Sequence, residues 1–129
     1  MRSLANSLLI LLAAHGVAEA CEPPRLDAST RIEGKRHVLL YRSVPSPPPL
    51  NTAFGIEIAI CAKDGASVAA PRVEAWMPAH RHGMNYRPSV AVKSPGLFRA
   101  DGLLLHMPGR WEFVFELGGE RLTATHDLD

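Results

Sequence analysis

The fold class of this chain is decided by the stretch Phe54-Gly-Ile-Glu-Ile-Ala-Ile-Cys-Ala62. Its large apolar side chains recur at every second position, at Phe54, Ile56, Ile58 and Ile60. Successive side chains of a β-strand point to opposite faces, so a period of two collects these four on one face. The stretch is therefore predicted to be a half-buried strand of an antiparallel sheet.

On both sides of this stretch, short apolar runs alternate with turns rich in proline and glycine. Further strands are predicted over 37–41, 72–77, 89–93, 97–100, 102–107, 111–117 and 121–126. The turn signals between them include Pro95-Gly96 and Gly118-Gly119. No long helical pattern and no internal repeat is visible. The pattern predicts an all-β protein, an immunoglobulin-like antiparallel sandwich of about seven strands.

The chain divides into a predicted leader and one domain. Residues 1–20 have the features of a secretory signal peptide: Arg2 near the start, an apolar run over 8–14, and Ala18-Glu19-Ala20 as a cleavage site. Residues 21–52 are predicted to form an N-terminal segment with one strand and a proline-rich connector. Residues 53–129 form the remainder of a single sandwich, which spans 21–129 in all. We expect an exported, periplasmic protein; lipid anchoring at Cys21 is less favoured, because lipoprotein signals rarely carry a residue such as Glu19 there.

The chain contains two cysteines, Cys21 and Cys61. In an exported protein the oxidising compartment makes a disulfide the default state of such a pair. A free thiol, a metal ligand and lipidation of Cys21 are the alternatives.

The charge balance excludes several classes of partner. The formal net charge is +1, which gives no electrostatic footprint for nucleic acid. No basic amphipathic stretch marks the chain for a membrane surface. No Ser-His-Asp order, paired catalytic carboxylates or phosphate-binding loop is visible, so we expect no enzyme and identify no substrate.

Chemically distinctive residues concentrate in Trp76-Met-Pro-Ala-His-Arg-His-Gly-Met84 and in His106-Met-Pro-Gly109. In an extended segment His80, His82 and Met84 share one face, so a single ion could be bound locally. Gly83 allows backbone angles that would fold Met84 towards the two imidazoles. These three residues are the predicted primary metal site.

Three further residues are candidates to complete that site: Met107, His106 and Met77. Because His106 and Met107 are adjacent, only one of them would reach the site from a regular strand. For Met77 the alternative is core packing at the end of a strand. Imidazole and thioether suit copper, with thioether favouring Cu(I) and Cu(II) as the alternative. Zinc is less favoured, because thioether is a poor zinc ligand. A purely structural role for the loop, through hydrogen bonds from the imidazoles, is also open.

The same residues carry a family resemblance. The pattern Met77-Pro78-x-His80-x-His82-Gly83-Met84, with Met107-Pro108-Gly109-x-Trp111 downstream, resembles the YtkA-like (FixH-related) exported domains. The resemblance covers about positions 53–125. It implies an immunoglobulin-like sandwich of the bacterial cell envelope, often encoded beside copper-handling and cytochrome-oxidase assembly proteins, and a binding module rather than an enzyme.

Two functional hypotheses follow. The first is an exported copper-binding protein that sequesters or delivers the ion in the periplasm, with another envelope protein as donor or acceptor. The second is a non-catalytic adaptor or assembly module of a membrane complex, which uses the His/Met loop as a structural or contact surface, since methionine suits adaptable interfaces. The copper load of the purified protein discriminates between them.

Overall fold

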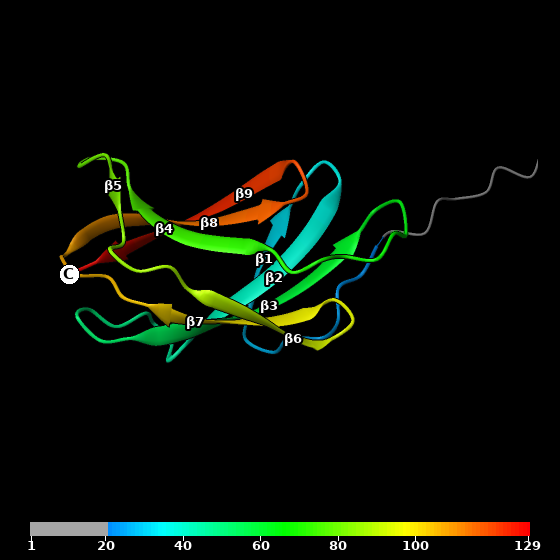
Figure 1. Cartoon of the computed structure of the whole chain (residues 1–129), viewed down its shortest axis with the longest axis horizontal. Helices are drawn as coiled ribbons and strands as arrows, with labels where there is room; N and C mark the ends of the chain where they lie inside the picture. Colours follow the sequence, from blue (N-terminus) through cyan, green and yellow to red (C-terminus); the bar gives the residue numbers. More distant parts are fainter. Residues whose placement is uncertain (1–20) are drawn as a thin grey trace, which may run out of the picture.

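A computed structural model describes residues 21–129, which form two antiparallel β-sheets packed face to face (Figure 1). The first sheet has the order β1 (Thr30–Glu33), β2 (His37–Val44), β3 (Phe54–Ala62), β7 (Leu97–Leu103), β6 (Ser89–Ser94). The second has the order β5 (His82–Gly83), β4 (Arg72–Met77), β8 (Gly109–Leu117), β9 (Glu120–Leu128). The predicted all-β antiparallel sandwich is confirmed, and the described residues include no helix that could cross a membrane. The predicted signal peptide, residues 1–20, lies outside the described residues.

The strand count and two strand boundaries differ from the prediction. The described residues hold nine strands rather than about seven. The N-terminal segment contains β1 as well as β2, and β1 was missed because Ile32 is its only large apolar residue. The predicted strand over 102–107 is wrong. There β7 ends at Leu103, and Leu105 makes only an isolated bridge to Leu50. Its apolar run arises because both Leu103, at the end of β7, and Leu105, in the following connection, are buried.

The core lies between the two sheets and explains why the alternating stretches form strands. Ile56, Ile58 and Ile60 of β3 are fully buried, which confirms the predicted face. Opposite them, the alternating apolar side chains of β4 and β8 complete the core: Val73, Ala75, Met77, Trp111, Phe113, Phe115 and Leu117. The sandwich therefore holds its strands by burial of one face from each sheet.

A disulfide joins the N-terminal segment to the end of β3. Cys21 and Cys61 are bonded, with their Cα atoms 5.9 Å apart and 40 positions apart in sequence. The predicted pairing is confirmed. It ties the segment before β1 to a central strand of the first sheet.

Glu120 connects the two sheets at one end of the sandwich. Its carboxylate accepts backbone N–H groups from Lys35 (2.7 Å), Arg36 (3.0 Å) and His37 (3.1 Å), and lies 3.0 Å from Nδ1 of His37. Burial alone would raise the pKa of Glu120, but the hydrogen bonds from Arg36, His37 and Lys35 outweigh it and lower that pKa. The carboxylate of Glu120, beside the β8–β9 turn, thus connects that turn to the β1–β2 turn by hydrogen bonds.

Replacing this carboxylate as Glu120→Gln is expected to lower the free energy of unfolding by about 1.5–3 kcal/mol, the usual contribution of hydrogen bonds to a charged group. Urea denaturation of the two proteins at neutral pH measures the loss. Because folding lowers the pKa of Glu120, its contribution is complete above about pH 5 and disappears as the pH falls through the lowered value. The two proteins should therefore converge on acidification. Glu112→Gln, on β8, is the matched control, and an equal effect of both variants would contradict this role for Glu120.

Candidate functional site

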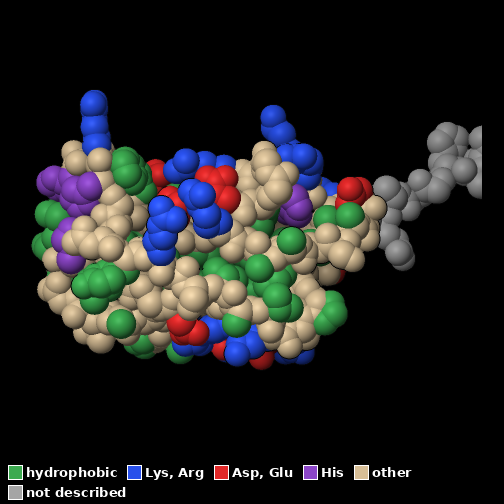
Figure 2. Space-filling model, viewed as in Figure 1, with side chains coloured by type: hydrophobic (Ala, Val, Ile, Leu, Met, Phe, Trp, Pro, Cys, Tyr) green, Lys and Arg blue, Asp and Glu red, His purple; other side chains and the backbone are tan. Residues whose placement is uncertain are grey.

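The two sequence segments rich in histidine and methionine meet at one end of the sandwich. His80 and His82 come from the β4–β5 hairpin, and His106 comes from the β7–β8 connection. Their imidazoles form a row with His82 in the middle: the ring centroids of His80 and His82 are 5.7 Å apart, and those of His82 and His106 are 5.3 Å apart. Figure 2 shows histidine side chains gathered at the end of the molecule that carries β5. We call these three residues the histidine cluster.

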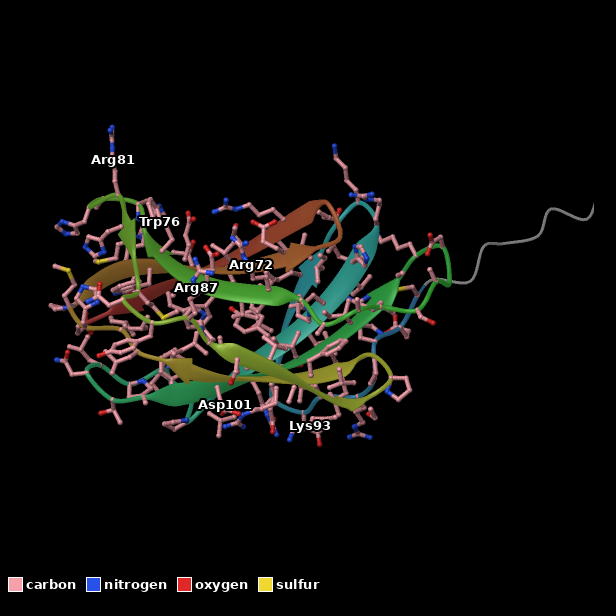
Figure 3. The ribbon with its side chains drawn as sticks, viewed as in Figure 1. Arg72, Trp76, Arg81, Arg87, Lys93 and Asp101 are labelled. Carbon is pink, nitrogen blue, oxygen red and sulfur yellow. A yellow bond between two sulfur atoms is a disulfide. The ribbon has the colours of Figure 1, made fainter. Side chains whose placement is uncertain are left out.

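The β4–β5 hairpin brings two of these rings side by side. In its turn the carbonyl of Met77 accepts the N–H of His80 at 3.2 Å, and Arg81 adopts a φ of 53°. A tight turn followed by a left-handed residue is a common way to close a short hairpin. Figure 3 shows the Arg81 side chain pointing away from the molecule. The turn therefore leaves the cluster free of the Arg81 charge.

The loop that carries His106 is held on both sides of it. On one side the carbonyl of Leu105 accepts the N–H of Asn51 at 2.8 Å. On the other, the carbonyl of Met107 accepts the indole N–H of Trp111 at 3.0 Å. His106 thus has a fixed backbone position.

Trp111 lies beneath the histidine cluster and forms its floor, the buried surface on which two of the imidazoles pack. It is fully buried, as its core position in β8 predicts. Its ring meets His82 and His106 edge to face, with centroid distances of 6.1 and 5.5 Å. No sequence pattern indicated this contact, because it joins His82 to a segment more than twenty residues further along the chain.

One hydrogen bond fixes the protonation pattern of the central ring. Nδ1 of His82 lies 3.1 Å from the carbonyl oxygen of Gly83. A carbonyl only accepts, so Nδ1 is the donor of this bond, and Nε2 is the ring nitrogen left for another partner. Metal-binding histidines commonly donate their second nitrogen to a backbone carbonyl in this way.

The methionines have other surroundings. Met77 is 1% exposed in the core, and its methyl group lies where a side chain at Gly109 would be, 2.7 Å from that Cβ position. Met84 and Met107 are half-buried and pack against the core. Of the predicted residues, the structure therefore brings His80, His82 and His106 together, and packs all three thioethers against apolar neighbours.

Within residues 21–129, no three histidine, cysteine, aspartate or glutamate side chains already converge to hold a metal ion. Imidazoles that share one ion through nitrogens at about 2.0–2.1 Å place their ring centroids roughly 5–6 Å apart. Both neighbouring pairs in the cluster have separations in that range. The three imidazoles are donors that metal ions accept, but both neighbouring pairs are stacked, with planes inclined by 28° and 30°. Side-chain rotation is therefore needed before their nitrogens could share one ion.

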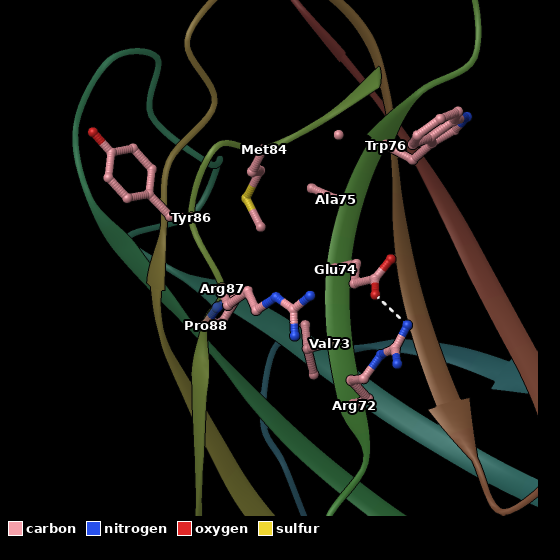
Figure 4. Close-up of a pocket in the computed structure, with 10 residues that line it drawn as sticks. Arg72, Val73, Glu74, Ala75, Trp76, Met84, Tyr86, Arg87 and Pro88 are labelled. Atoms are coloured by element: carbon pink, nitrogen blue, oxygen red, sulfur yellow. Dashed lines mark hydrogen bonds and ion pairs between the residues drawn. The ribbon is translucent and has the colours of Figure 1, made fainter. Parts of the chain in front are cut away.

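A groove of about 400 Å³ lies beside β4 and is lined by none of the three histidines. Met84 and Arg87 reach into it, while Tyr86 points away from it (Figure 4). An ion pair between Arg72 and Glu74, at 2.6 Å, lies on its rim. Sequence reasoning missed this groove, which the connection from β5 to β6 creates by crossing between the sheets.

The two other histidines of the described residues 21–129 have side-chain partners elsewhere in the sandwich. His37 contacts Glu120, and Nε2 of His126 lies 2.8 Å from the hydroxyl of Tyr41. Burial lowers the pKa of His126, and the neighbouring carboxylate of Asp127 only partly opposes this effect. Both rings therefore lie apart from the histidine cluster and contact other strands of the sandwich.

Fold and site together define a small, disulfide-bonded antiparallel β-sandwich with a histidine cluster at one end. No protein-family profile matches the chain, and no curated protein or solved structure matches it significantly. A function is therefore inferred from the geometry of the cluster.

Proposed function

We propose that this chain is an exported copper-binding protein that sequesters or delivers the ion in the periplasm. The observation that carries the proposal is the position of His82. Its ring lies 5.7 and 5.3 Å from those of His80 and His106, and its Nδ1 bonds to the carbonyl of Gly83, which leaves Nε2 for an ion. Imidazole nitrogen is a good copper ligand. We propose binding rather than catalysis, with another envelope protein as donor or acceptor of the ion.

Export is part of the same proposal. The predicted signal peptide supports it, and so does the Cys21–Cys61 disulfide, because such bonds persist in oxidising compartments. Neutral imidazoles need no free thiol, so the cluster would work where thiols are oxidised. Membership of the YtkA-like family and an immunoglobulin-like topology are consistent with this proposal and stay predictions.

The adaptor is the second candidate function, and the groove beside β4 favours it. Tyr86 is 59% exposed next to that groove, and an exposed aromatic side chain beside an apolar hollow is a common feature of protein contact surfaces. In this alternative the histidine cluster only shapes the end of the sandwich.

The copper content of the purified protein separates the two functions. We expect the wild-type protein to retain copper after dialysis, and His80→Ala/His82→Ala to lose most of it, because two of the three neighbouring imidazoles are gone. Metal analysis after copper loading measures this, with circular dichroism to check the fold. The matched control is His126→Gln, outside the cluster, which should keep its copper. Equally negligible copper in the wild type and the double variant would contradict the copper proposal and favour the adaptor.

A further inference from the structure

We propose that the ion held at the histidine cluster is Cu(II), bound by His82 and His106 with His80 as the third imidazole, and that the methionines lie outside its ligand set. This inference rests on the proposed copper function and specifies its oxidation state and ligands. It replaces a local site of two histidines and Met84 with one that joins two distant segments of the chain.

The three methionine side chains pack against the core or its edge. Met77 is almost fully buried against Gly109. Met84 faces the groove beside β4, and none of the three histidines lines that groove (Figure 4). Met107 also packs against the core. Moving the sulfur of Met77 onto an ion would expose apolar surface that folding has buried, at a cost of roughly 25 cal/mol for each Å².

His106 needs little reorganisation to act as a ligand. The bonds from Asn51 to Leu105 and from Trp111 to Met107 hold the backbone on either side of it. Its ring lies 5.3 Å from that of His82, with the planes inclined by 30°. A backbone that is already held in place loses less entropy on binding. A rotation of the imidazoles is therefore the main change that binding requires.

A site of imidazoles without thioether selects Cu(II). Thioether and thiolate favour Cu(I), whereas nitrogen and oxygen donors in a tetragonal arrangement suit Cu(II), which also binds such sites more tightly than other divalent first-row metals, zinc included. His80 is exposed, and His82 and His106 are half-buried. Water therefore has access to the remaining positions around the ion, which Cu(II) accepts.

The test is a pair of titrations of the full chain, one with Cu(II) and one with Cu(I), each against a competing chelator, with electron paramagnetic resonance of the Cu(II) form. We expect tighter binding of Cu(II), with splitting from several imidazole nitrogens. His106→Ala should weaken Cu(II) binding by at least about tenfold, since even residues that only orient ligands change metal affinity by about 10–100-fold. Met84→Leu should leave Cu(II) binding unchanged.

The outcomes separate this inference from the function on which it rests. His106→Gln and unfolding curves of each variant show whether a loss reflects the ligand or the fold. Cu(II) binding that survives both His106 substitutions, or that is lost in Met84→Leu, overturns the ligand set and leaves a copper protein. Tighter binding of Cu(I) than Cu(II) overturns the oxidation state in the same way. No binding of either ion overturns both proposals.

Discussion

Removal of the Cys21–Cys61 disulfide, as Cys21→Ala/Cys61→Ala, is expected to lower the free energy of unfolding by about 4 kcal/mol. The bond closes a chain segment with a sequence separation of 40, and the chain-entropy model gives about 4 kcal/mol for a loop of that length. Without it, the unfolded chain gains conformational freedom that the folded sandwich does not share. Urea denaturation of the oxidised wild type and the double variant measures the difference.

Two comparisons show whether the bond acts only on stability. Reduced wild-type protein should unfold at the same urea concentration as the double variant. The described chain starts at the end of the sandwich away from β5 (Figure 1), so copper binding by the folded variant should equal that of the wild type. A stability change below about 1 kcal/mol would contradict the entropic argument. Loss of copper at unchanged stability would instead make the cysteines metal ligands.

The sequence predicted those strands whose two faces have different surroundings. In β3 and β8, apolar side chains alternate because one face of each is buried between the sheets, and both strands were located correctly. Hydrophobic periodicity missed the strand β1 and wrongly predicted a strand over 102–107. β1 is an exposed edge strand that needs little apolar surface, whereas Leu103 and Leu105 are buried without forming a continuous strand. Hydrophobic periodicity reports which residues are buried. It reports strand pairing only where pairing and burial coincide.

The same limit applies to the candidate site. Local spacing singled out His80 and His82, whose rings lie side by side. It could not show that Met84 faces a groove, because that depends on where the next connection crosses the sheets. Nor could it place His106, whose position depends on bonds from Asn51 and Trp111, both distant in the chain. Contacts of this kind are set by tertiary packing.

Trp111→Ala is expected to lower the free energy of unfolding by about 3–5 kcal/mol, the usual range for truncating a buried large aromatic side chain. Trp111 is fully buried, bonds to the carbonyl of Met107 and forms the floor of the histidine cluster. The substitution leaves a cavity under His82 and His106 and frees the loop that carries His106. We therefore expect weaker copper binding as well as lower stability.

The matched control for this variant is Phe115→Ala, which truncates another fully buried ring on the same face of β8. We expect a similar loss of stability, with copper binding unchanged in the protein that remains folded. Trp111→Phe separates the two roles of the indole, since it keeps an aromatic ring and removes the N–H that bonds to Met107, at a cost of about 1 kcal/mol. If Trp111→Ala and Phe115→Ala affect copper binding equally, Trp111 acts on the site only through global stability, and the floor contact has no separate role in positioning His106.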